Sequence, residues 1–217
     1  MNIIQDIIPV GSSNRPRTRL NATYITIHET ANTSKGANAS THARYVKGAD
    51  ARSRKVSWHF TVDDKSIYQH LPINEVGWHA GVGNSQSIGI ELCVNSDGNF
   101  EQTKKNAQWL INKLMKDLNI PLSRVVTHKQ WTGKNCPAKL LSTFNQFKEG
   151  IVKPVTQPKP APKPVDNTPD TWAKESWEKA NKKIGKDGQP ILDGSRPKDT
   201  MTRQELAKVL DRLGVLD

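Results

Sequence analysis

The chain has 217 residues, of which 35% are hydrophobic and 24% are charged. This composition is typical of a soluble globular protein, and no run of residues approaches the roughly 18 consecutive apolar residues that a membrane-spanning helix needs. The net charge of +11 at pH 7 favours an acidic partner, such as nucleic acid, anionic lipid or an anionic wall polymer, and charge alone cannot choose among these.

The sequence shows neither a nucleic-acid reader nor a secretion signal. It has no zinc-finger spacing, no aromatic RNP pattern and no basic helix with heptads, which disfavours nucleic-acid binding. The first 19 residues lack a basic segment followed by a long apolar stretch, so we expect no secretory signal peptide and synthesis in the cytoplasm. Cys93 and Cys136 could form a disulfide, but a chain without a secretion signal favours the reduced state.

The first part of the chain mixes short β-branched segments with helical patterns. We expect strands at Tyr24–His28, Ser57–Val62, Ile67–His70, Ser87–Val94 and Arg124–His128. A short helix is expected at Ser40–Lys47. Apolar residues recur at helical spacing over Glu101–Leu118, and Asn119 and Pro121 stand where such a helix would end. The mixture predicts an α/β fold with a central mixed β-sheet flanked by helices.

A segment rich in proline and lysine, residues 153–169, separates a domain at residues 1–152 from a small helical module at residues 170–217. Its composition is typical of a semi-rigid extended linker. In the module, Trp172–Lys183 is expected to be a helix, and Thr202 and Glu205 form the T-x-x-E pattern of a capping box before a second one. Two short helices are too small to secure a core of their own, so a partner or a second copy would help, and the oligomeric state stays open.

The histidines are residues 28, 42, 59, 70, 79 and 128. A single histidine is more often structural than a ligand, so position must decide. His28 and His128 each end a predicted buried strand, and both imidazoles emerge at one rim if these strands are parallel neighbours. Cys136 follows in a loop with Gly133 that can fold back over the strand end. Two imidazoles and one thiolate suit zinc, and three protein ligands leave a fourth position for water.

Five sequence blocks occur in an order that resembles a known enzyme family. They are HETAN (His28–Asn32), SWHFTVDD (Ser57–Asp64), WHAG (Trp78–Gly81), SIGIEL (Ser87–Leu92) and THKQWTGKNCP (Thr127–Pro137). Together they are similar to the zinc-dependent N-acetylmuramoyl-L-alanine amidases of the amidase-2 family, which are related to phage lysozyme-type amidases and peptidoglycan recognition proteins. The resemblance covers roughly residues 20–145. It implies that His28, His128 and Cys136 hold Zn²⁺, with cysteine where some members have aspartate.

The resemblance implies cleavage of the amide between the lactyl group of N-acetylmuramic acid and the L-alanine of the peptidoglycan stem peptide. Zinc would act as the Lewis acid. Glu91 is the candidate base that moves a proton from water to the leaving amine. The alternative for Glu91 is a strand-end charge that faces solvent. Lys134 matches the family lysine that stabilises the developing oxyanion, and is otherwise an ordinary loop lysine.

Other side chains near these blocks are candidates for binding substrate. His79 is expected either to hydrogen-bond the substrate near the metal or to orient its own loop. Trp131 is expected to stack on sugar or peptide, with an anchoring role in the core as the alternative. His59 is expected to be a packed strand residue, and His42 and His70 are expected to be structural.

The C-terminal module has a shorter similarity, in WAKESWEKA, ILDGSRPKD and TRQELAKVL, to cell-wall-anchoring segments of lytic enzymes. This implies wall targeting, with a dimerising or stabilising helical pair as the alternative.

The combined expectation is a phage or prophage endolysin that leaves the cytoplasm through holin-made lesions and acts on the wall. Its partners would be peptidoglycan and anionic wall polymers, without nucleic acid or membrane insertion. A host autolysin of the same chemistry and a non-catalytic peptidoglycan binder are the alternatives.

Overall fold

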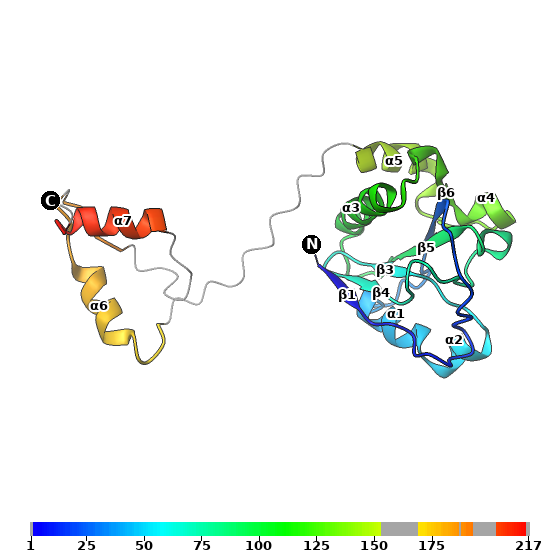
Figure 1. Ribbon diagram of the computed structural model, residues 1–217, viewed down its shortest axis with the longest axis horizontal. Helices are drawn as coiled ribbons and strands as arrows, with labels where there is room; N and C mark the ends of the chain where they lie inside the picture. Colours follow the sequence, from blue (N-terminus) through cyan, green and yellow to red (C-terminus); the bar gives the residue numbers. More distant parts are fainter. Residues whose placement is uncertain (1, 153–168, 187, 193–202, 216–217) are drawn as a thin grey trace. The chain divides into compact units, whose positions relative to one another are not determined.

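The structure is a computed structural model, and it describes residues 2–152, 169–186, 188–192 and 203–215. The chain divides into two compact units, Met1–Gln157 and Pro158–Asp217, which Figure 1 traces in sequence colours. The predicted proline-rich linker lies outside the described residues except for its last position. Within the described parts, no helix has the length and apolar character needed to cross a membrane.

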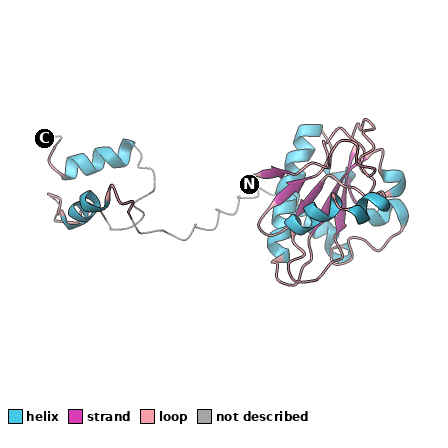
Figure 2. Cartoon of the chain, turned by 90° about the horizontal axis from the view of Figure 1, so that it is seen from below, coloured by secondary structure: helices cyan, strands magenta, loops and turns pink. Residues whose placement is uncertain are grey.

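The larger unit is built on a six-stranded sheet with strand order β1-β4-β3-β5-β2-β6. The strands are β1 (Ile3–Gln5), β2 (Tyr24–Glu29), β3 (Phe60–Val62), β4 (Ile67–Gln69), β5 (Ser87–Leu92) and β6 (Val125–Thr127). Neighbouring strands pair in parallel, except that β3 and β4 are antiparallel. Helices lie around this sheet (Figure 2), so the predicted α/β fold with a mixed central sheet is confirmed.

Alternation along the central strands separates an apolar face of the sheet from a polar one. The apolar face is made by Ile25 and Ile27 of β2 and by Ile88, Ile90 and Leu92 of β5, all fully buried. Successive side chains of a strand point to opposite faces, so the residues between them turn the other way. His28 and Glu91 are two of these, and the register places them directly opposite each other. The period-two pattern therefore puts polar chemistry on one face of an otherwise apolar sheet.

The helices of this unit are α1 (Ala39–Val46), α2 (Ala49–Ser53), α3 (Phe100–Leu118), α4 (His128–Thr132) and α5 (Phe144–Val152). Helix α3 covers the apolar face with Leu110, Ile111 and Leu114, and each such burial contributes about 1.5–3 kcal/mol. It starts after the Asn99 cap and ends at Asn119, whose φ of 52° stops the helix as expected. Helix α1 instead contacts β3 and β4. Figure 1 shows α3 and α5 on one side of the sheet, and α1 and α2 on the other.

Several predicted boundaries move. Strand β3 begins at Phe60, because Ser57 and His59 bond through their backbone N–H groups to Trp78 and Gly89 outside a regular ladder. Strand β6 stops at Thr127, so His128 begins α4 and does not end a strand. Strand β1 and the short helices α2, α4 and α5 were not predicted from the sequence.

An ion pair ties the N-terminal segment to the body of the larger unit. The Arg15 guanidinium donates from Nε and Nη2 to both carboxylate oxygens of Glu75 at 2.8 Å, and from Nη1 to the Ile8 carbonyl oxygen at 2.7 Å. The two charged side chains are only 9% and 19% exposed. A two-point charged contact of this kind fixes the chain entering the sheet in a single geometry.

The smaller unit contains α6 (Lys174–Lys182) and α7 (Arg203–Arg212), both at places where the sequence predicts helices. Arg212 donates to the carbonyl oxygens of Gln189 and Pro190, which joins the end of α7 to the loop after α6. Trp172, just before α6, is 87% exposed. The predicted capping residue Thr202 lies outside the described residues.

Candidate metal centre and its pocket

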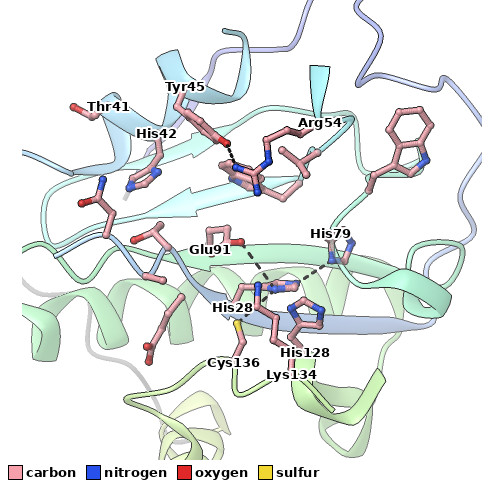
Figure 3. Close-up of a pocket in the computed structure, with 17 residues that line it drawn as sticks. His28, Thr41, His42, Tyr45, Arg54, His79, Glu91, His128, Lys134 and Cys136 are labelled. Carbon is pink, nitrogen blue, oxygen red and sulfur yellow. Dashed lines mark hydrogen bonds and ion pairs between the residues drawn. The ribbon is translucent and has the colours of Figure 1, made fainter. Parts of the chain in front are cut away.

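Three side chains from separate parts of the chain converge on the polar face of the sheet (Figure 3). His28 comes from β2, His128 is the first residue of α4, and Cys136 lies in the loop after α4. One ligand atom from each residue lies within 4.8 Å of the others, and all three residues are buried. The three predicted metal ligands are thus brought together.

The strand pairing and one turn explain this convergence. Strands β2 and β6 are parallel neighbours, with Ile27 opposite Thr127, so the next residue of each chain segment is a histidine at the same level. Gly133 ends α4 with a φ of 76°, a conformation that favours glycine. The chain then folds back, and the Lys129 N–H donates to the Cys136 carbonyl oxygen at 3.0 Å. The expected return of the loop over the strand end is what the structure shows.

The geometry fits a zinc ion. The distance from Cys136 Sγ to His28 Nδ1 is 3.8 Å. Tetrahedral zinc with ordinary Zn–N and Zn–S bonds places such atoms roughly 3.6 Å apart. The buried Nδ1 of His128 has no hydrogen-bond partner among the described residues. Burial raises the pKa of the Cys136 thiol to about 11, so a cation that binds there must displace a proton.

A chain of two hydrogen bonds fixes which nitrogen His28 presents to the metal position. Nε2 of His79 lies 3.3 Å from the Ser87 carbonyl oxygen, which can only accept, so this nitrogen carries the proton. Burial lowers the pKa of His79 to about 3 and that of His28 well below its usual range, so both rings are neutral. His79 Nδ1 then accepts from His28 Nε2 at 3.0 Å, and His28 Nδ1 keeps its lone pair for the metal.

A glycine makes room for this arrangement. A Cβ on Gly89 would lie 2.7 Å from the ring of His79, closer than real contacts allow. A Cβ on Gly83 would likewise lie 2.7 Å from the ring of Trp131. The SIGIEL block therefore needs glycine at its centre so that the imidazole of His79 can lie over the strand.

Glu91 lies beside the cluster and is not a solvent-facing charge. Its Oε1 is 4.0 Å from His28 Nδ1, and its side chain is 15% exposed. Its buried Oε2 lacks a hydrogen-bond partner in the described part of the chain. Burial raises the pKa of Glu91 to about 8, although the positive charge of Lys134 acts in the opposite direction. The alternative considered for Glu91, a strand-end charge in water, is therefore wrong.

The cluster opens into a pocket of about 420 Å³. Glu91, Lys134 and His79 line it together with the three candidate ligands. Figure 3 shows a second wall opposite them, from which Tyr45 and Arg54 project. The pocket is thus a cleft between the metal cluster and the α1 side of the unit, of a size that suits part of a peptide or sugar substrate.

Trp131 does not line this pocket. Its indole Nε1 donates to Thr26 Oγ1 at 2.9 Å, and its ring meets Tyr24 edge-on with centroids 5.1 Å apart. These contacts favour the alternative considered for Trp131, an anchor that holds α4 against β2, over stacking on substrate.

The remaining histidines differ in role. His59 Nδ1 accepts from the Gly89 N–H, and its Nε2 lies 2.8 Å from the Glu75 carbonyl oxygen, so His59 is packed as expected, although it lies just before β3 and not within it. His70 Nε2 lies 2.9 Å from Thr61 Oγ1 in the buried interior, which fits a structural role. His42 lines the pocket, which the sequence did not reveal. A histidine within a helical segment carries no sequence signal of the cavity it faces.

Comparison with known proteins finds consistent relatives. Residues 18–139 match the Amidase_2 family model, described as N-acetylmuramoyl-L-alanine amidase. The N-acetylmuramoyl-L-alanine amidase CwlH of Bacillus subtilis is 56% identical over 164 residues, which cover 73% of this chain and 64% of that protein. XlyA of the same organism, also an N-acetylmuramoyl-L-alanine amidase, is 58% identical over 155 residues, 70% of this chain and 51% of that protein.

A solved structure of the catalytic domain of XlyA superposes with a TM-score of 0.67 at 57% identity and covers 70% of this chain and 99% of that one. A mutant endolysin from Bacillus subtilis gives the same values. The chain spans 64% and 51% of the two curated relatives that it matches. The family match falls entirely within the larger unit.

Proposed function

This chain belongs to the Amidase_2 family, and from that premise we propose that it hydrolyses the amide bond between the lactyl group of N-acetylmuramic acid and the L-alanine of the peptidoglycan stem peptide. The observation that carries the proposal is the buried cluster of His28, His128 and Cys136 with Glu91 beside it in one open pocket. An amidase needs both a Lewis-acid position and an adjacent proton carrier, and this pocket offers both.

The proposed metal is Zn²⁺, because a set of two imidazoles and one thiolate favours zinc over magnesium or calcium. When bound, zinc supplies Lewis acidity at the scissile carbonyl. His28, His128 and Cys136 would hold it. His79 acts on one of these ligands, since its acceptance of the His28 Nε2 proton keeps His28 Nδ1 directed toward the cluster.

Glu91 is the proposed proton carrier. Its unpartnered Oε2 can take a proton from the water that attacks the carbonyl carbon. The same carboxyl then gives this proton to the departing nitrogen as the C–N bond breaks. The products are the lactyl carboxylic acid and the free amino group of L-alanine. Because the Glu91 side chain is only 15% exposed, the proton that it carries is largely shielded from bulk water.

Lys134 is the proposed stabiliser of negative charge. It lines the pocket two residues before Cys136, and its ammonium acts electrostatically on Glu91, His28 and His128. A fixed positive charge at this position lowers the energy of the oxyanion that develops on the carbonyl oxygen.

The similarity to an endolysin supports the proposal that this chain acts on the cell wall as an endolysin, after synthesis in the cytoplasm. The smaller unit is proposed to bind the wall, either its peptidoglycan or its anionic polymers. The exposed Trp172 is consistent with a binding surface there. Tethering by this unit would raise the concentration of substrate near the pocket.

The test is an analysis of products from purified peptidoglycan. Zinc-loaded protein should release new amino termini on L-alanine and no new reducing sugar ends. Glu91→Gln should retain zinc while turnover falls by about 100- to 10,000-fold, the range typical for loss of a proton carrier. Glu101→Gln, a matched loss of one carboxylate on the exposed start of α3, should behave as wild type. New reducing ends, or zinc-loaded protein without amine release, would refute the proposal.

A further inference from the structure

Unpaired polar atoms gather in the pocket. Among the described residues, the structure records seven buried side-chain atoms without a hydrogen-bond partner, and five belong to residues that line this pocket. They are Glu29 Oε1, Thr30 Oγ1, His42 Nε2, Glu91 Oε2 and His128 Nδ1. Buried polar atoms are normally paired, so such a concentration marks a place where a ligand supplies the partners. The proposed chemistry accounts for Glu91 and His128 and leaves Glu29, Thr30 and His42 unexplained, and of these three only His42 comes from the wall opposite the metal cluster.

His42 lies apart from the metal cluster. It comes from α1, and Figure 3 shows it with Tyr45 and Arg54 on the wall of the pocket that faces His128 and Cys136. Its side chain belongs to a residue only 8% exposed, and its Nε2 has no partner within the described residues. A buried ring nitrogen at the edge of an open pocket is placed to meet a ligand.

The state of the His42 ring determines what it can bind. Burial lowers the pKa of His42, and a hydrogen bond to the Ala37 backbone opposes this lowering. Only an acceptor, the Ala37 carbonyl oxygen, can favour the protonated ring in this way, so one ring nitrogen donates to it. The lowered pKa keeps the ring neutral, so the nitrogen that does not donate to Ala37, the unpartnered Nε2, is an acceptor. It therefore needs an N–H or O–H donor from the ligand.

Arg54 adds a positive charge to the same wall. Its Nη1 lies 3.3 Å from the Tyr45 hydroxyl and 3.5 Å from Asp50 Oδ2, and the Tyr45 hydroxyl donates to that same carboxylate oxygen at 2.8 Å. Both partners of the Arg54–Asp50 pair are about 60% exposed, at 63% and 60%. Exposed pairs of this kind are weak, so most of the guanidinium fork is available to a carboxylate that enters the pocket.

We propose that the wall formed by His42 and Tyr45 of α1 and by Arg54 at the end of α2 is a subsite for the stem peptide. In this subsite His42 Nε2 accepts a peptide N–H and the Arg54 guanidinium binds a carboxylate of the same peptide. This inference rests on the proposed function, because the metal cluster fixes the scissile amide at the opposite wall. A peptide that extends from that amide across the pocket presents both an N–H donor and carboxylates. The ligand class is an acidic peptide attached through its alanine to muramic acid.

The histidine part is tested by a matched pair of variants. His42→Asn keeps an amide N–H near the position that donates to Ala37 but removes the acceptor at Nε2. His42→Gln places an amide oxygen near Nε2. With a soluble muramoyl tripeptide, His42→Asn should raise KM by about 2- to 12-fold, as expected for one hydrogen bond, with kcat and zinc content unchanged. His42→Gln should recover part of this loss. An unchanged KM in His42→Asn, or a fall in kcat or zinc content, would overturn the assignment.

The arginine part is tested with paired substrates. The two muramoyl tripeptides differ only in whether the residue after alanine carries a free carboxylate or its carboxamide. Wild-type protein should prefer the carboxylate by about tenfold in kcat/KM, and Arg54→Gln should abolish the preference. Arg52→Gln is the control, because Arg52 is exposed on the same segment and does not line the pocket. No preference in wild type, or equal effects of the two variants, would overturn the role of Arg54.

The two possible failures are distinguishable. If wild-type protein releases no alanine amino termini from any muramoyl peptide, the proposed function fails and the subsite falls with it. If wild type cleaves both tripeptides while the His42 and Arg54 variants match it in every constant, the amidase stands and only the subsite is refuted.

Discussion

His79 acts on the metal position without being one of the three clustered ligands. The Ser87 carbonyl oxygen holds a proton on one nitrogen of His79, the other nitrogen accepts from His28, and His28 is left with a free Nδ1 beside Cys136. A single backbone carbonyl thus selects the tautomer of two successive rings. Such outer contacts commonly change metal affinity by about 10- to 100-fold.

Replacement of His79 should therefore weaken metal binding before it affects the fold. His79→Leu removes the acceptor for His28 and should raise the dissociation constant for zinc by about 10- to 100-fold, as measured by competition with a chromophoric chelator. His79→Asn, whose side-chain oxygen can stand near the lost Nδ1, is the matched control and should retain most of the affinity. Equal zinc affinity in His79→Leu and wild type would show that the ring does not orient His28.

The site residues differ in how far the sequence could predict them. His28, His128 and Cys136 stand at ends of recognisable segments within ordered blocks, so their convergence could be expected. His42 could not be recognised, because its importance depends on a cavity and on an unpaired nitrogen that only the folded chain creates. Trp131 is an aromatic residue of the kind that stacks on ligands, yet its indole N–H donates to Thr26 Oγ1 inside the domain.

Elements with a sustained apolar pattern were predicted well. The short elements α1, β4 and β6 also lie within one residue of their predicted bounds, whereas β1, α2, α4 and α5 were missed. Strands β2 and β5 and helix α3 lie within two residues of their predicted bounds, because their apolar periodicity is sustained over at least six residues. Strand β1, Ile3–Gln5, has only three residues and exists through its pairing with β4. Tertiary pairing of this kind leaves no local sequence signal.

The segment that follows β1 is held by the Arg15–Glu75 ion pair. The hydrogen bonds from Arg15 lower the pKa of Glu75 below its ordinary value of 4.5. A carboxylate with a lowered pKa in the folded state contributes stability above its unfolded pKa. That contribution is lost as the pH falls through the folded pKa.

Glu75→Gln should therefore destabilise the larger unit in a pH-dependent way. At pH 7 the loss should be about 2 kcal/mol, typical of hydrogen bonds to a charged group in a mostly buried pair. Urea unfolding from pH 7 to pH 3 should show the gap to wild type closing below about pH 4.5. Asp117→Asn, which removes the exposed partner of Lys113, is the control and should cost less than about 1 kcal/mol. A gap that stays constant across this pH range would contradict the ion-pair explanation.

The molecule combines a unit that carries the pocket with a smaller one of proposed wall-binding function. The XlyA catalytic-domain structure corresponds to 70% of this chain, so residues equivalent to the larger unit exist as a separate folded domain in a relative. The present chain likewise divides after Gln157 into a larger unit, which carries the pocket, and a smaller unit.

Removal of the smaller unit should separate binding from catalysis. A protein of residues 1–157 should retain the kcat/KM of the full chain on a soluble muramoyl tripeptide, because every residue that lines the pocket remains. Its retention on intact cell walls in a sedimentation assay should fall, because one of two tethered contacts is gone. Equal retention of the truncated and full-length proteins would refute the wall-binding role of the smaller unit.

The most direct test of the molecule's proposed chemistry is zinc add-back to chelated full-length protein, with bound zinc and the release of L-alanine amino termini from peptidoglycan measured in the same samples. Amine release should be absent after chelation, rise in proportion to bound zinc and level off at one equivalent per chain. Cys136→Ala should lose both tight zinc binding and amine release. Chelated protein that still works at the wild-type rate, or Cys136→Ala that holds one zinc tightly, would contradict a zinc amidase built on His28, His128 and Cys136.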